Sequence, residues 1–106
     1  MSAPQPVLDS VHPAQNPLAA WREIDGIVVV ISPEDSVLHE LNPTAGFIWK
    51  RATGERTTEE IARLLADEYE VDVATALADT REMIAELAAK KLLHLEAPSA
   101  AEVSRG

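Results

Sequence analysis

A hairpin signal constrains the fold of this chain more than any other feature: the stretch WREIDGIVVVIS at residues 21–32. Asp25 and Gly26 suit a two-residue type I′ turn, because both central positions of that turn take positive φ angles. Ile24 and Ile27 flank this pair, as the ends of two paired strands do. We therefore predict an antiparallel hairpin centred on these residues.

A third strand is predicted to follow the hairpin. SPEDS at 32–36 predicts a second turn, because Pro33 is preset for the second position of a type I turn. SVLHEL at 36–41 then completes a three-stranded meander. The middle strand, 27–31, is apolar at every position, whereas an antiparallel strand with one wet face alternates. We expect both of its faces to be covered, one by helices and the other by the N-terminal segment or a partner.

Helical patterns take over at Asn42, a favoured N-cap residue, with Pro43 at the first helical position. Apolar residues recur at helical spacing up to a buried Trp49, and Gly54 is expected to end the helix in a left-handed cap. The second helix opens with a Thr57–Glu60 capping box. Its predicted apolar face consists of Ile61, Leu64, Leu65 and Tyr69.

Asp72 is predicted to cap a third helix, whose apolar stripe is Leu77, Ile84, Leu87 and Ala88. KLLHL at 91–95 closes the domain as an extended segment. The fold class is therefore α+β and winged-helix-like, a three-stranded antiparallel meander followed by three helices.

The length of 106 residues is enough for one domain. Residues 1–17 hold four prolines and little periodicity, so we predict a flexible N-terminal segment there. The folded domain is predicted to span 18–96, and 97–106 reads as a flexible C-terminal tail.

The charge and composition of the chain argue against nucleic acids and membranes as partners. Eighteen acidic residues against nine basic ones give a formal net charge of −9, which disfavours nucleic acids and anionic membranes. The chain has no Cys and shows neither an export signal nor a membrane-length apolar run, so a cytoplasmic location is expected. A winged helix-turn-helix DNA-binding regulator is the alternative for 57–91, but its third helix offers Arg81 and Lys90 against three acids.

Residues that carry chemistry are sparse. The three histidines, at positions 12, 39 and 94, do not share the spacing of a metal site, and no nucleophile stands beside a base. We predict that the chain is not an enzyme and holds no metal or cofactor.

The segment from Leu38 to Leu93 resembles the PqqD family. The pattern is a strand ending in Leu-Asn, an Ala-x-x-Ile-Trp helix, a Thr-x-x-Glu-Ile-x-x-x-Leu helix and a long third helix ending in Leu-Leu. The resemblance implies a peptide-recognition module that binds the leader of a ribosomally made precursor peptide. It would present the precursor to a modifying enzyme, such as a radical SAM enzyme or a leader peptidase. The pathway stays open between PQQ, lasso peptides and other products.

The resemblance also implies a site, in which the leader adds a strand to the third β-strand and rests against the third helix. On the strand we expect Val37, Leu38, His39 and Glu40 to bind, with the His39 N–H as a donor to the peptide. This edge lacks the Lys, Pro or bulge that usually protects one, and β-augmentation is a recurring way to read extended peptides. The alternatives are that the N-terminal segment covers the edge, or a second copy in a homodimer.

On the third helix we predict that one flank of the apolar stripe forms the wall of the groove. The flank consists of Ala76, Thr80 and Met83, because Met adapts to flexible apolar ligands. The opposite flank is Ala74, Ala78 and Ala85. The competing interpretation is that Met83 belongs to the core.

Overall fold

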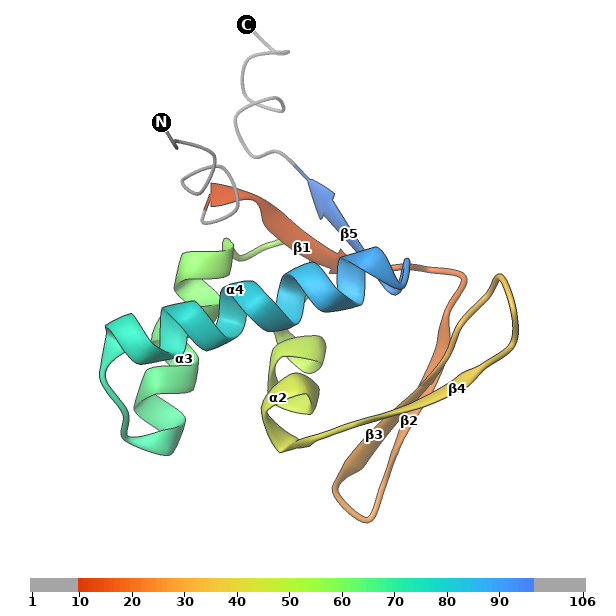
Figure 1. The fold of residues 1–106 in the computed structure, drawn as a ribbon, viewed down its shortest axis with the longest axis horizontal. Coiled ribbons are helices and arrows are strands. Elements are labelled where there is room, and N and C mark those ends of the chain that lie inside the picture. Colours follow the sequence, from red (N-terminus) through yellow and green to blue (C-terminus); the bar gives the residue numbers. More distant parts are fainter. Residues whose placement is uncertain (1–9, 97–106) are drawn as a thin grey trace, which may run out of the picture.

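The computed structural model describes residues 10–96, which form an α+β fold with a three-stranded meander and three helices (Figure 1). The predicted fold class is confirmed. None of the described helices is long and apolar enough to cross a membrane. The elements are β1 (His12–Gln15), β2 (Ala20–Ile24), β3 (Ile27–Ile31), β4 (Leu38–Leu41), α2 (Pro43–Arg51), α3 (Thr58–Tyr69), α4 (Val73–Ala89) and β5 (Leu93–Glu96).

The meander forms as predicted, with strand order β2-β3-β4 and antiparallel pairing throughout. Ile24 pairs with Ile27, and the two residues between them, Asp25 and Gly26, have φ angles of 54° and 83°. These positive values are the ones that a type I′ turn requires. The turn chemistry in the sequence therefore fixes the register of β2 on β3.

Residues 12–15 form strand β1, although they belong to the predicted flexible N-terminal segment. β1 pairs antiparallel with β5 in a second sheet of two strands. The Gln15 N–H donates to the Ala52 carbonyl oxygen at 2.9 Å, and its side chain donates to the Trp49 carbonyl oxygen at 2.8 Å. The folded part therefore starts before residue 18. The rest of the predicted flexible segment, 1–9, and the predicted tail, 97–106, lie outside the described residues.

The three predicted N-caps are confirmed, but the left-handed cap predicted at Gly54 is wrong: α2 ends at Arg51, and its C-cap is Ala52, with φ −84° and ψ 72°. The side chain of Asn42 accepts from the Ala45 N–H at 2.8 Å, with Pro43 in the first turn. Thr57 and Glu60 form the reciprocal capping box, and Asp72 accepts from the backbone of α4. These caps satisfy N–H groups that the first turn of a helix leaves without a partner.

The core lies between the inner face of the meander and the three helices. Trp49 is fully buried, as predicted, and packs with Ile48 of the same helix and with Val28 and Val30 of β3. A β-carbon at Gly46 would lie 3.1 Å from Val28 Cγ2, so the glycine allows α2 to approach β3 closely. α2 is thereby held against the middle of the sheet.

The outer face of β3 departs from expectation. Val28 and Val30 are buried, but Ile27 and Ile31 on the other side of the strand are exposed. β1 pairs with β5 and leaves this face open, so the described part of the N-terminal segment does not cover it. The unbroken apolar run at 27–31 therefore does not mean that residues 10–96 cover both faces of β3.

Two helix faces are also rotated from their predicted positions. The buried stripe of α4 consists of Ala76, Thr80, Ile84 and Leu87, while the predicted stripe residue Leu77 lies at its margin. Small side chains occupy the centre because α4 packs along α3 in its N-terminal half. On α3, Leu64 and Tyr69 are exposed, and the small residues Ala62 and Ala66 are buried in their place.

Candidate functional site

β4 is an edge strand whose hydrogen-bonding directions can be assigned from the ladder. The Ser32 N–H donates to the Val37 carbonyl oxygen at 2.9 Å. Hydrogen-bonded pairs alternate with non-bonded pairs along an antiparallel ladder. The next hydrogen-bonded pairs are therefore Val30 with His39 and Val28 with Leu41.

It follows that the N–H and C=O groups of Leu38 and Glu40 point away from the sheet, toward the open edge. The prediction that the His39 N–H serves as a donor to an added strand is corrected, because that N–H points toward Val30.

Hydrogen bonds in the turn before β4 hold the start of this edge strand in place. The Val37 N–H donates to Asp35 at 3.1 Å, and this bond and one with the Ser32 side chain lower the pKa of the Asp35 carboxyl.

A groove of about 360 Å³ runs between β4 and the C-terminal half of α4. Its floor is apolar and includes Leu41 of β4, Ala45 of α2 and Leu87 of α4. Its rim is charged. Glu86 of α4 and Lys90, the C-cap of that helix, form an ion pair at 3.1 Å on this rim. The groove thus combines open backbone groups along one wall with apolar side chains at its base.

The structure brings four of the seven predicted site residues to this groove. They are Leu38, His39, Glu40 and Met83. Val37 precedes β4 and is exposed, but it is not among the residues that line the groove. Met83 is partly buried, packs against the main core and also lines the groove. It is therefore both a core residue and a groove residue, the two roles that the sequence left open.

Ala76 and Thr80 do not reach the groove. Both side chains are fully buried, and Ala76 belongs to a cluster with Leu65 and Ala66 of α3. Their predicted contact with a peptide is therefore corrected. The reason is the rotation of α4, which places this flank against α3.

Several residues that line the groove were not predicted from the sequence. They include Glu86 and Leu87 of α4 and its C-cap, Lys90, at spacings of three, four and seven from Met83. Those spacings share one face of a helix, so the face could have been found by extending from Met83 toward the C-terminus. Leu92 follows α4 and could not have been placed by helical spacing.

Other kinds of site find no support among residues 10–96. No group of three or more His, Cys, Asp or Glu side chains in this range could hold a metal ion. His12 contacts the Gly54 carbonyl oxygen through its Nδ1 atom at 2.9 Å, which is a structural contact. The exposed side of α4 carries Asp79 and Glu82, which would repel the phosphates of DNA.

Residues 28–93, more than half of the chain, match the family described as Coenzyme PQQ synthesis protein D (PqqD). The chain belongs to the PqqD family. The PqqD match runs from β3 to the start of β5 and includes both walls of the groove. No match was found among curated proteins.

Solved structures with this fold include two relatives above 25% identity. TbiB1 in complex with the TbiA(beta) leader peptide has a TM-score of 0.70 and 27% identity, and the match covers 76% of this chain and 94% of that chain. The PqqD truncation of Methylobacterium extorquens PqqCD, described as a functional and stand-alone RiPP recognition element, has a TM-score of 0.65 and 29% identity, covering 79% and 88%.

A lasso peptide synthetase B1 complexed with its leader peptide has a TM-score of 0.70 and covers 78% of this chain and 98% of that chain. Its identity is 22%, so this similarity concerns the fold alone.

Proposed function

We propose that this protein is a peptide chaperone that binds the leader of a ribosomally synthesised precursor peptide on the open edge of β4. The observation that carries the proposal is the outward direction of the Leu38 and Glu40 backbone groups beside a groove with an apolar base and a charged rim. An unprotected edge of this kind readily accepts another strand. The similarity to TbiB1, which is described in complex with a leader peptide, supports the same occupant here.

Binding would use two kinds of contact. The leader backbone would pair with the N–H and C=O groups of Leu38 and Glu40, which gives affinity without regard to sequence. Alternate leader side chains would point toward α4, because successive side chains of a strand lie on opposite faces. There they would meet Met83 and Leu87, and the ion pair on the rim would limit which residues fit.

The chemistry would belong to a separate enzyme, such as a radical SAM protein or a leader peptidase. The Methylobacterium extorquens relative is described as a stand-alone recognition element, which supports a non-catalytic role for this chain. The cytoplasm, where precursor peptides are synthesised, would be the place of action. PQQ, lasso-peptide and other pathways all remain compatible with this role.

A pair of proline variants tests the proposal. The probe is a fluorescein-labelled synthetic leader of a short precursor peptide identified among the neighbouring genes, and the readout is fluorescence anisotropy. Glu40→Pro removes an N–H that points outward, and an edge strand tolerates proline there. We expect a folded domain whose affinity falls by about tenfold or more, because it loses a hydrogen bond and leaves a peptide carbonyl unpaired.

Glu40→Thr is the matched control, because it removes the same carboxylate and keeps the N–H. We expect it to bind the leader within about threefold of the unchanged protein. His39→Pro should instead unfold the meander locally, because its N–H points toward β3. A folded Glu40→Pro variant with full affinity would contradict pairing through β4.

A further inference from the structure

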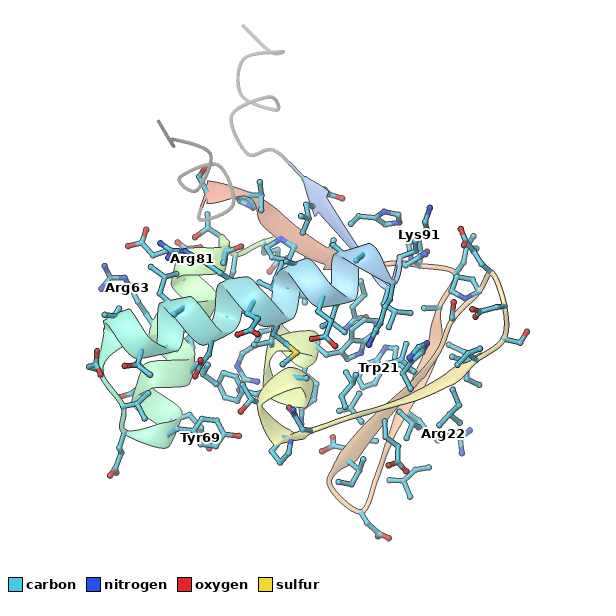
Figure 2. The ribbon with its side chains drawn as sticks, in the orientation of Figure 1. Trp21, Arg22, Arg63, Tyr69, Arg81 and Lys91 are labelled. Atoms are coloured by element: carbon cyan, nitrogen blue, oxygen red, sulfur yellow. The ribbon has the colours of Figure 1, made fainter. Side chains whose placement is uncertain are left out.

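The outer face of the meander, on the side of the sheet away from the helices and the peptide groove, is a largely apolar surface. It carries alternate residues of the three strands, including Ile24 of β2, Ile31 of β3 and Leu38 of β4. Their exposed fractions are 49%, 40% and 56%. Figure 2 shows the alternation on β2, with Trp21 toward the helices and Arg22 on the opposite side of the strand.

This face is continuous with the peptide groove. A shallow hollow of about 320 Å³ lies on it, lined by Ile24, Val29, Ile31 and other residues of the sheet. Leu38 lines both this hollow and the groove between β4 and α4. A strand added to β4 would therefore widen the outer face, and every second side chain of that strand would join it.

The size of the face argues against a stable dimer. Three strands of four or five residues, spaced about 4.8 Å apart, cover roughly 250 Å² of sheet. Stable complexes bury about 800 Å² on each partner. The face alone therefore suits a transient contact, which a fourth strand would strengthen by adding area.

The charges around the face favour a partner of opposite sign. Asp25 lies in the turn at one end of the sheet, Glu34 and Asp35 lie in the turn at the other end, and Glu40 lies on the strand at the open edge. All four are exposed. Arg22 is the one Lys or Arg among residues 20–41, and the whole chain has a net charge of −9. A second copy would bring like charges together, whereas a basic rim would be attracted.

We propose that the outer face of the meander docks the modifying enzyme, through an apolar patch on the enzyme that is rimmed by Lys and Arg. This inference rests on the proposed function, because the bound leader supplies the fourth strand. The enzyme then contacts the chain and the outward side chains of the leader on one continuous surface. It binds the loaded chain more tightly than the empty one.

The test uses the full chain, the synthetic leader and a purified modifying enzyme identified in the same gene neighbourhood as the precursor. Ile24→Thr/Ile31→Thr removes apolar contacts from the outer face and keeps β-branched side chains, which suit strands. Val71→Thr/Val73→Thr is the matched control, because these residues are similarly exposed, at 43% and 40%, but lie at the junction of α3 and α4. Surface plasmon resonance measures enzyme binding with and without saturating leader.

We expect the Ile24→Thr/Ile31→Thr variant to bind leader normally and to bind the enzyme at least tenfold more weakly, with no change in the control. Normal enzyme binding by this variant would overturn the inference and leave the proposed function intact. If the unchanged chain does not bind leader, the proposed function itself fails.

Two other possible occupants of the outer face, a second copy of the chain and the chain's own ends, would give different experimental results. A dimer of the unchanged chain in light scattering that becomes a monomer in Ile24→Thr/Ile31→Thr would assign the face to a second copy. Nuclear Overhauser contacts from the Ile24 and Ile31 methyl groups to residues outside 10–96 would assign it to the chain's own ends. Either result would overturn docking of the enzyme.

Discussion

Trp21 of β2 stands edge-on to Trp49 of α2, with ring centroids 6.0 Å apart and ring planes at 79°. Beside this pair, Lys50 and Glu23 form an ion pair at 3.1 Å. Both contacts join the β2 side of the meander to α2. They fix the sheet on the helices from one side and leave β4, at the opposite edge, available for another strand.

The tryptophan pair should be energetically coupled. Trp21→Ala is expected to cost about 2 kcal/mol of unfolding free energy, because its side chain is 39% exposed. Trp49→Leu should cost about as much, since it opens a cavity in the core. In a double-mutant cycle by urea denaturation, we expect a coupling of about 1 kcal/mol. Strictly additive losses would show that the edge-on contact contributes nothing.

Met83 should affect both stability and peptide binding. Met83→Ala is expected to lower the unfolding free energy by about 1–2 kcal/mol, less than a fully buried Met would, and to weaken leader binding about fivefold to tenfold. Leu77→Ala is the matched control, since Leu77 is half-buried on α4 but does not line the groove. Denaturation and anisotropy on the same samples separate the effects. Equal leader affinity in the two variants would remove Met83 from the site.

The local elements could be predicted from the sequence because local chemistry determines them. The Asp25–Gly26 turn and the caps at Asn42, Thr57 and Asp72 depend on side chains within a few residues. β1 could not be found in this way. Its partner strand, β5, lies some 80 residues further along, and the residues of β1, His-Pro-Ala-Gln, have no clear alternating pattern of their own.

The candidate site was predictable in its strand and only partly in its helix. The side chains of a strand alternate between two faces, so only two orientations of β4 are possible. The apolar Leu41, which is buried, determines which face of β4 is turned toward the core. Helical periodicity is continuous, so a rotation of α4 moved Ala76 and Thr80 from the expected groove into the contact with α3. The sequence did not reveal that rotation because alanine suits either position.

Acid should weaken the start of α4. Hydrogen bonds from the Thr75 side chain and N–H hold the pKa of the Asp72 carboxyl below its ordinary value of 3.8. A lowered pKa means that this contribution is complete above the ordinary value and is lost as the pH falls below it. Asp72→Asn cannot titrate but keeps a cap acceptor. We expect the difference in Tm between the unchanged protein and this variant to shrink below about pH 4. A difference that stays constant down to about pH 2 would contradict this role.

Amide hydrogen exchange on β4 distinguishes strand addition from other modes of peptide binding. In the unbound protein, the Leu38 and Glu40 amides should exchange quickly because they point away from the sheet, and the His39 and Leu41 amides should be protected by β3. Saturating leader peptide should slow exchange at Leu38 and Glu40 by about tenfold or more and change the other two little. Bound leader with unchanged exchange at Leu38 and Glu40 would contradict binding through the edge of β4.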